Sequence, residues 1–236
     1  MAPKNYTEYC SIERSDTPMT RRVKTDHMTD MADECFDLPF DGLCKFYPFE
    51  VPDLPDYKIL AVVGKSGSGK STMLKSLSEK ESDLRYFPDL NLPESFIQLE
   101  ENPAAAAEAY IRRFEEIGLD PAKFLSKKFY QLSEGEKFRA SMALQIASGT
   151  VFDEFTSMVD RTVAETVSEG LRRIVDEENL SRVVVCSCHT DFVEWLEPDV
   201  VVDLNDSKVY VRGLTEGCED CTGCDSEILI GSIEVR

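Results

Sequence analysis

The stretch AVVGKSGSGKSTMLKSL, residues 61–77, constrains the fold of this chain more than any other. It places a glycine-rich loop directly between a short apolar run and a run whose apolar residues have helical spacing. The run Lys58–Val63 has the length and apolar character of a buried strand. The run after the loop places Met73, Leu74 and Leu77 at helical spacing. The loop therefore joins a strand to a helix.

The loop itself, Gly64-x-x-x-x-Gly69-Lys70-Ser71, has the spacing of a phosphate-binding loop. Glycines allow successive backbone N–H groups to point at one anion, and the following helix adds the positive end of its dipole. Lys70 then reaches the outer phosphates, and Ser71 ligates magnesium. An ordinary glycine-rich turn is the alternative, but the flanking strand and helix favour binding of a nucleoside triphosphate. The expected nucleotide contacts are Gly64, Lys65, Ser66, Gly67, Ser68, Gly69, Lys70, Ser71 and Thr72.

A second apolar strand, within Thr150–Asp160, ends in two adjacent carboxylates. Asp153 is expected to help hold hydrated Mg²⁺, and Glu154 to accept a proton from the attacking water. A solvated strand end is the more usual meaning of two such carboxylates. Their position after the phosphate loop favours the catalytic interpretation.

The order of the remaining motifs resembles that of the ABC (ATP-binding cassette) ATPase family. Leu132-Ser133-Glu134-Gly135-Glu136 is similar to the family signature, Ser157–Asp160 to its D-loop, and His189 in VVVCSCHTD to its switch histidine. Gln98 is a weaker match to the Q-loop. The resemblance covers residues 45–212, and several segments look like short stand-alone ABC ATPases of bacteria and phages.

The resemblance implies a head-to-tail homodimer with two ATP molecules at the seam, where Ser133 and Gly135 cap the phosphate held by the partner. It implies that Glu154 and His189 are catalytic, and that Gln98 senses Mg²⁺ and water. Two residues depart from the family pattern. Glu134 places a carboxylate near the partner's phosphate unless it faces solvent or meets a lysine, and Phe155 replaces a proline. The family also stacks adenine on an aromatic ring, for which three residues remain open: Phe40, Phe46 and Tyr47.

Charge and composition limit the partners. The 236 residues carry a net charge of −19, which disfavours nucleic acid and anionic membranes, although Arg21, Arg22 and Lys24 form an early basic group. No apolar run approaches the ~20 residues of a membrane span, and the N-terminus lacks a secretory signal. We therefore expect a cytoplasmic protein with reduced thiols.

The C-terminal sequence GCEDCTGC raises a separate question. Cys218, Cys221 and Cys224 have the spacing to bind zinc or to take part in an iron–sulfur site. A fourth ligand is then needed, for which Cys10, Cys35 and Cys44 are candidates. A loop of free thiols is the alternative.

Together these patterns predict an α/β phosphate-loop NTPase with a mainly parallel sheet, a small N-terminal β region and a compact helical subdomain. The expected parts are an N-terminal extension (1–44), an ATPase domain (45–212, with helical residues about 92–147) and a C-terminal tail (213–236). The segment NDSKVYVRG, residues 205–213, is expected to form a turn that leads into an edge strand. The main functional hypothesis is a soluble ATPase acting on an unknown protein or DNA partner. The alternatives are the ATP-binding subunit of a membrane transporter, whose membrane partner we consider less expected, and an ATP-gated clamp on DNA or protein.

Overall fold

The computed structural model describes residues 3–28, 31, 35, 42–81, 84–86, 103–124, 127 and 129–213. Within these residues, seven strands form one sheet in the order β1-β9-β8-β4-β7-β6-β5, and β2 pairs with β3. The strands are β1 (Tyr6–Ser11), β2 (Met19–Arg22), β3 (Leu43–Phe46), β4 (Ile59–Val63), β5 (Arg85–Tyr86), β6 (Thr150–Phe152), β7 (Val183–Ser187), β8 (Val200–Asp203) and β9 (Lys208–Arg212). The helices are α2 (Lys70–Lys80), α3 (Pro103–Glu116), α4 (Pro121–Phe124), the 3₁₀ turn η2 (Phe129–Gln131), α5 (Glu134–Gln145), α6 (Arg161–Glu177) and α7 (Phe192–Leu196).

The centre of the sheet is parallel, which confirms the predicted fold class. β4 pairs in parallel with β7 and β8, and β6 pairs in parallel with β5 and β7. At the other end of the sheet, β9 runs antiparallel to both β8 and β1. The segment 205–213 does form a turn and a strand, but the predicted edge position is wrong, because the N-terminal strand β1 pairs outside β9.

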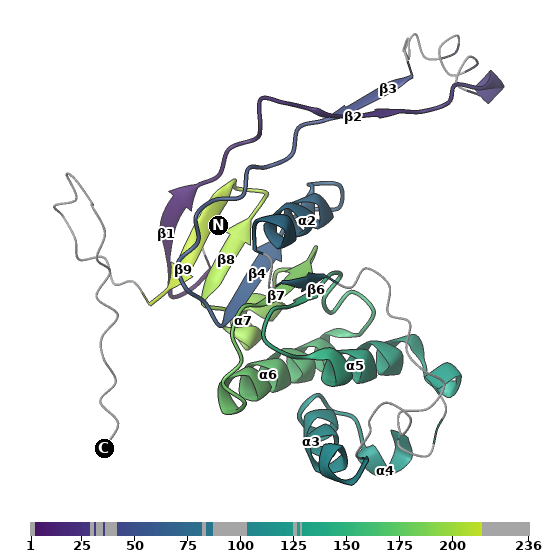
Figure 1. The fold of residues 1–236 in the computed structure, drawn as a ribbon, viewed down its shortest axis with the longest axis vertical. Coiled ribbons are helices and arrows are strands. Elements are labelled where there is room, and N and C mark those ends of the chain that lie inside the picture. The colour runs from purple at the N-terminus through teal and green to yellow at the C-terminus, as the bar shows by residue number, and fades with distance from the viewer. Residues whose placement is uncertain are drawn as a thin grey trace, which may run out of the picture.

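Strand β4 lies at the middle of the sheet, and its side chains alternate between two hydrophobic cores. Ile59, Ala61 and Val63 face a core with α3, α5, α6 and α7. Leu60 and Val62 face the opposite core with α2. All five are buried because helices cover both faces (Figure 1). This three-layer packing fixes the carboxyl end of β4, from which the phosphate loop emerges.

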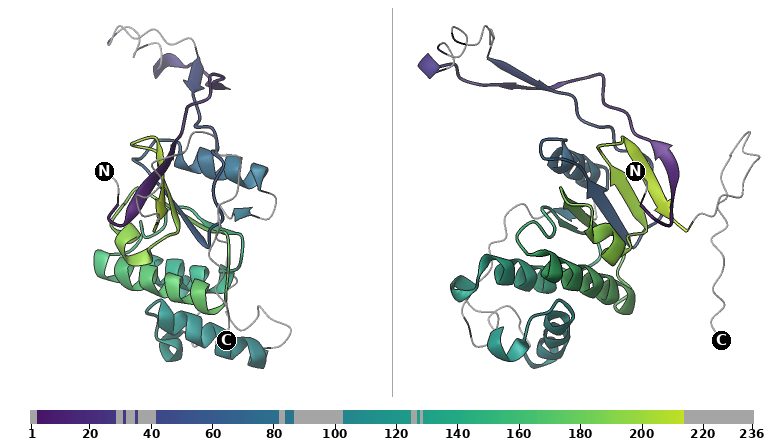
Figure 2. Two further views of the ribbon diagram at one scale, coloured as in Figure 1. Left: turned by 90° about the vertical axis from the view of Figure 1, so that its left-hand side faces the viewer. Right: turned by 180° about the vertical axis from the view of Figure 1, so that it is seen from behind.

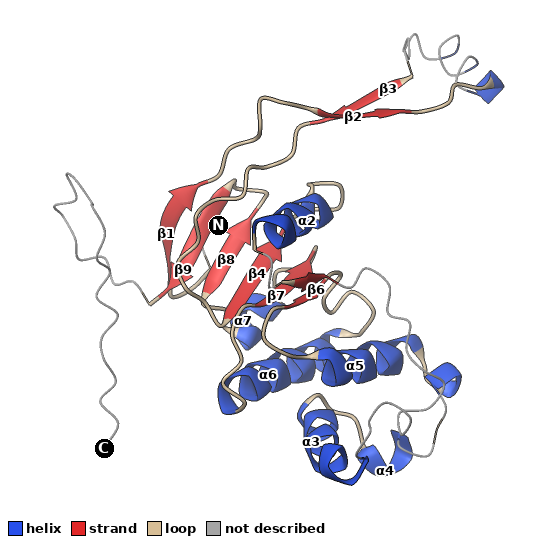
Figure 3. Ribbon diagram, in the orientation of Figure 1, coloured by secondary structure: helices blue, strands red, loops and turns tan. Residues whose placement is uncertain are grey.

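Most helices gather at one end of the molecule, below the sheet in Figure 3. The described chain between β5 and β6 consists of α3, α4, η2 and α5. Helix α6 packs against both α3 and α7. Gly118 follows the end of α3 at φ 72°, a left-handed conformation that commonly ends a helix and that glycine adopts without steric cost.

The hairpin β2–β3 projects away from the rest of the described chain (Figure 2). All four residues of β2 are exposed. At the root of the hairpin, Met19 pairs with Phe46, and Arg22 pairs with Leu43 farther out. The hairpin therefore joins the body near Phe46, close to the phosphate loop.

Candidate functional site

The phosphate loop holds its lysine in a fixed position. Lys70 begins α2, and the residue is only 6% exposed. Its Nζ donates to the backbone carbonyls of Gly64, at 2.9 Å, and Lys65, at 3.1 Å. A buried ammonium needs acceptors or an anion. The loop thus presents a positive charge where the sequence predicted contact with the outer phosphates.

The glycines and a serine of the loop form a cradle. Gly67 has φ 77° and Gly69 has φ 105°, a left-handed conformation that glycine adopts without steric cost. The hydroxyl of Ser68 is buried and has no hydrogen-bond partner among the described residues. An unsatisfied buried hydroxyl is costly, and a phosphate oxygen would supply its missing acceptor. The loop therefore fits a bound phosphate.

The predicted magnesium ligands lie together. Ser71 Oγ donates to Asp153 Oδ2 at 2.7 Å, which joins the start of α2 to the end of β6. Buried Cys186, on the neighbouring strand β7, also hydrogen-bonds to Asp153, and burial raises the pKa of its thiol. The thiol therefore stays protonated and donates to the carboxylate. A serine hydroxyl and a carboxylate are the hard oxygen donors that Mg²⁺ prefers, so Ser71 and Asp153 would hold the ion.

Glu154 follows directly and is exposed. Its backbone φ is 53°, and Ser157 Oγ donates to its Oε2 at 2.8 Å. The next residue, Phe155, is fully buried, and its N–H donates to the carbonyl of Cys186 at 2.7 Å. Its ring packs edge-on against Phe192, with centroids 5.3 Å apart. Phe155 thus anchors the turn in the core and leaves the Glu154 carboxylate in solvent.

His189, the predicted switch histidine, lies just after the end of β7. His189 is exposed, so it is not a core histidine, and its N–H donates to Ser187 Oγ at 3.2 Å. Two residues later, Asp191 accepts two hydrogen bonds from Arg161 Nη1, both 2.8 Å. Arg161 also donates to the carbonyl of Thr156 at 3.0 Å. The sequence analysis missed this bridge, which ties the D-loop region to the segment after His189, because ion-pair partners 30 residues apart leave no local pattern.

The residues predicted to form the family signature lie at the start of α5, on the opposite face of the sheet from α2 (Figure 1). Ser133 is the N-cap of α5 in a capping box with Glu136, and the backbone N–H of Ser133 lowers the pKa of that carboxyl. A β-carbon on Gly135 would lie 3.2 Å from Val159, so glycine allows the D-loop to pack closely. Glu134 pairs with Lys137 at 2.5 Å, which offsets the extra carboxylate that the sequence introduced.

The aromatic candidates for base stacking differ in position. Phe40 lies outside the described residues, and Tyr47 is 46% exposed. Phe46 touches the phosphate loop, because a β-carbon on Gly69 would lie 2.7 Å from its Cζ. Arg14, which the sequence analysis missed, lies over the rings of Phe49 and Phe46. Phe46 and Arg14 therefore lie together beside the phosphate loop.

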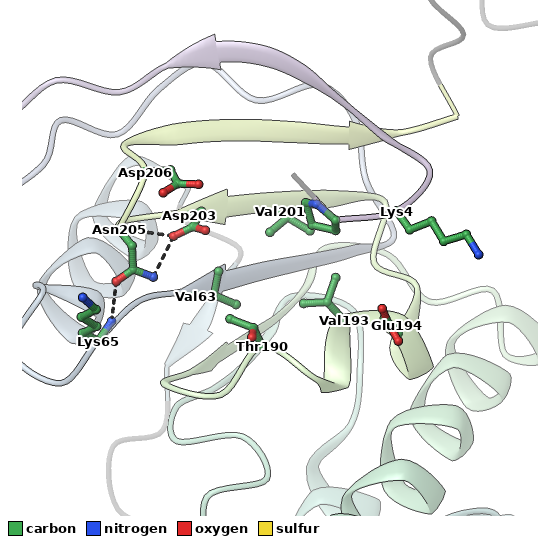
Figure 4. Close-up of a pocket in the computed structure, with 11 residues that line it drawn as sticks. Lys4, Val63, Lys65, Thr190, Val193, Glu194, Val201, Asp203, Asn205 and Asp206 are labelled. Carbon is green, nitrogen blue, oxygen red and sulfur yellow. Dashed lines mark hydrogen bonds between the residues drawn. The ribbon is translucent and has the colours of Figure 1, made fainter. Parts of the chain in front are cut away.

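A cavity of about 680 Å³ lies beside the first part of the loop, lined by residues of β8, α7 and the N-terminus (Figure 4). Along its rim, Asn205 Oδ1 accepts the N–H of Lys65 at 2.9 Å, and Asn205 Nδ2 donates to Asp203 at 2.9 Å. The turn after β8 thereby holds the start of the phosphate loop. Neither Lys70 nor Asp153 lines this cavity, so it is separate from the expected phosphate and magnesium positions.

Some predicted residues fall outside the part of the chain that the structure describes: Gln98, Cys218, Cys221 and Cys224. Their roles stay predictions. In the described ranges, no group of three histidine, cysteine or acidic residues has the arrangement of a metal site. The zinc or iron–sulfur proposal thus has no support here. No helix in the described ranges is long and apolar enough to cross a membrane.

Comparison with known proteins supports the motif analysis. No protein-family model matches the chain. It is 24% identical over 199 residues to the sulfate/thiosulfate import ATP-binding protein CysA of Synechocystis sp., covering 70% of this chain and 55% of CysA. It is 25% identical over 231 residues to the energy-coupling factor transporter ATP-binding protein EcfA2 of Spiroplasma kunkelii, covering 75% of each chain.

Solved structures show the same fold. The dimeric structure of MJ0796, a bacterial ABC transporter cassette, superposes with a TM-score of 0.55 at 15% identity, covering 81% of this chain and 93% of MJ0796. A dimeric post-hydrolysis state of MJ0796 with ADP and Pi has the same TM-score at 16% identity, covering 85% and 98%.

Fold and site together define a phosphate-loop NTPase. Within that class, the chain is similar to ABC-type ATPase domains in the order of its motifs, in sequence to the two relatives, and in fold to the MJ0796 cassette.

Proposed function

We propose that this chain hydrolyses ATP as a stand-alone, cytoplasmic ABC ATPase that pairs head to tail with a second copy. The contact between Ser71 and Asp153, at 2.7 Å, carries the proposal. It joins residues 82 positions apart at the carboxyl end of two parallel strands, beside the buried ammonium of Lys70. Ligands bind at this edge in open α/β sheets.

Each side chain has a distinct task in this proposal. Lys70 and the loop amides hold the triphosphate and stabilise charge on the transferring phosphoryl group. Ser71 and Asp153 would hold Mg²⁺, which would supply neutralisation of the phosphate charge. Glu154 accepts a proton from the attacking water, and Ser157 fixes the direction of its carboxylate at 2.8 Å.

Pairing supplies the missing side of the site. Ser133 caps α5, a twelve-residue helix whose first N–H groups favour an anion. We propose that this end faces the phosphates on the second copy. The dimeric state of the cassette with the same fold supports this arrangement. The Glu134–Lys137 ion pair lowers the charge penalty of such an approach.

Glu154→Gln tests both parts of the proposal. The amide cannot accept the proton, so phosphate release should fall about 10²- to 10⁴-fold while MgATP binding persists. Sedimentation velocity should then show an ATP-dependent dimer. Glu165→Gln, an exposed carboxylate on α6, is the matched control and should behave as the wild type. Wild-type turnover in Glu154→Gln, or a monomer at saturating MgATP, would contradict the proposal.

A second candidate function is the ATP-binding subunit of a membrane transporter. The names of both relatives favour it, although CysA matches over only 55% of its length. Affinity purification of tagged chain from detergent-solubilised membranes separates the two. A stoichiometric membrane-spanning partner would support the transporter, and recovery from the soluble fraction alone would support the stand-alone enzyme.

A further inference from the structure

Arg14 lies where the chain leaves the sheet and enters the projecting hairpin. It forms an isolated antiparallel bridge with Phe49. On either side of the bridge, the backbone N–H of Ser15 donates to the carbonyl of Pro48 at 2.8 Å, and the backbone N–H of Glu50 donates to the carbonyl of Glu13 at 2.9 Å. Two segments far apart in the sequence are therefore fixed beside one another at this point.

The guanidinium of Arg14 is held in place although its side chain is exposed. Its Cζ lies 4.1 Å from the centroid of the Phe49 ring, which is 5% exposed. Its Nη1 donates to the carbonyl of Tyr47 at 2.7 Å. The Phe49 ring beneath the guanidinium plane and the hydrogen bond at the edge of that plane restrict the arginine side chain, which is otherwise flexible. The result is a flat, preorganised surface.

This surface adjoins the phosphate loop through one side chain. Arg14 Cζ lies 6.0 Å from the centroid of Phe46, and the tip of the Phe46 ring touches Gly69. The Arg14 guanidinium, the Phe46 ring and the phosphate loop therefore lie one after another. A base attached to a triphosphate held by that loop needs a flat partner in this region.

We propose that the guanidinium of Arg14, backed by Phe49 and held by the Tyr47 carbonyl, is the platform on which the base of the bound nucleotide stacks. The plane of an arginine stacks on nucleobases much as an aromatic ring does. In this chain it takes the place of the aromatic ring expected from the family resemblance, and Phe46 forms the wall between base and loop. The inference rests on the proposed binding of a triphosphate at residues 64–72.

Two ligands distinguish the contribution of the base platform to binding from that of the phosphate loop. MgATP uses both, whereas magnesium tripolyphosphate, which has no base, uses the loop alone. Isothermal titration of the full chain should show that Arg14→Ala weakens ATP about tenfold. The affinity for tripolyphosphate should stay within about twofold, because the loop is unchanged and the variant is folded. Arg22→Ala, an exposed arginine of β2, is the control and should affect neither ligand.

Two further replacements of Arg14 then distinguish the contribution of its flat surface from that of its charge. Arg14→Tyr keeps a flat surface without charge and should recover most of the ATP affinity. Arg14→Lys keeps the charge without the plane and should recover less. Unchanged ATP affinity in Arg14→Ala, equal weakening of both ligands, or rescue by lysine but not tyrosine would overturn the platform. If the wild type binds neither ligand, the proposed ATPase function itself fails, which is a distinct result.

Discussion

The two halves of the proposed nucleotide site are built in different ways. The phosphate half consists of consecutive residues, Gly64 to Ser71, joined by one distant carboxylate, Asp153. The base half is assembled from Arg14, Phe46 and Phe49, which come from two segments on either side of the hairpin. Phosphate recognition needs a row of backbone N–H groups, so it requires a local motif. A stacking surface needs only a plane, which any segment can supply.

Of the changes that compare the two halves, removing the loop cation should have the largest effect, because it acts on the part that ATP and tripolyphosphate both use. Lys70→Met keeps the buried apolar stem and removes the ammonium that bonds to Gly64 and Lys65. Phosphate release should fall about 100- to 1000-fold. Affinity for tripolyphosphate should fall together with that for ATP, unlike in Arg14→Ala. An ATP-selective loss in Lys70→Met would break the division into two halves.

Gly69 lies where the halves meet, so it offers a matched pair of substitutions. Gly67→Ala and Gly69→Ala both place a side chain at positive φ, which costs about 1–2 kcal/mol. Only at Gly69 does the new β-carbon meet Phe46, at 2.7 Å, whereas nothing lies within 4 Å at Gly67. Gly69→Ala should therefore weaken ATP binding about tenfold more than Gly67→Ala.

The additional change Phe46→Leu tests the cause of that difference. It should recover part of the loss in Gly69→Ala, because it removes the ring that the new methyl group meets. Equal ATP affinities for the two alanine variants, measured by titration, would mean that Phe46 does not contact the loop in solution.

Ser133 belongs to neither half, since it is proposed to contact the phosphates bound by the second copy. Its substitution therefore tests that proposed contact. Ser133→Ala removes the N-cap of α5 and should lower the free energy of unfolding by about 1 kcal/mol. Ser133→Asp keeps a cap, so its stability should match the wild type. Turnover should fall in both variants if the hydroxyl faces the partner's phosphate. Full activity in Ser133→Asp, measured beside urea denaturation, would assign the serine to the helix alone.

The same contrast explains how much the sequence could predict. The parallel sheet and the phosphate loop follow from strand patterns and one motif of consecutive residues. Ser71 and Asp153 were each predicted from the end of an apolar strand, and the parallel sheet brings these two ends together. Strand β1 outside β9 was missed, since strand pairing between the two ends of a chain leaves no periodic signal. Arg14 was missed for a similar reason, because its value depends on Phe49 lying beneath it. The sequence therefore predicts local chemistry better than surfaces assembled from distant segments.

The smallest expected effect concerns the scaffold of the phosphate half, where Lys58 leads into β4 and pairs with Asp176 on α6 at 3.1 Å. Hydrogen bonding to Arg172 lowers the pKa of Asp176 from 3.8 to about 2. Because the folded state has the lower pKa, the ionised carboxylate stabilises the fold above about pH 4, and this contribution is lost as the pH falls toward 2. The wild type should thus be more stable than Asp176→Asn at pH 6, by a modest amount since the side chain is 46% exposed. Urea midpoints of the two proteins should converge toward pH 2. A constant difference between the midpoints at all pH values would show that Asp176 acts through packing rather than charge. The ion pair with Lys58 would then make no pH-dependent contribution to the stability of the phosphate half.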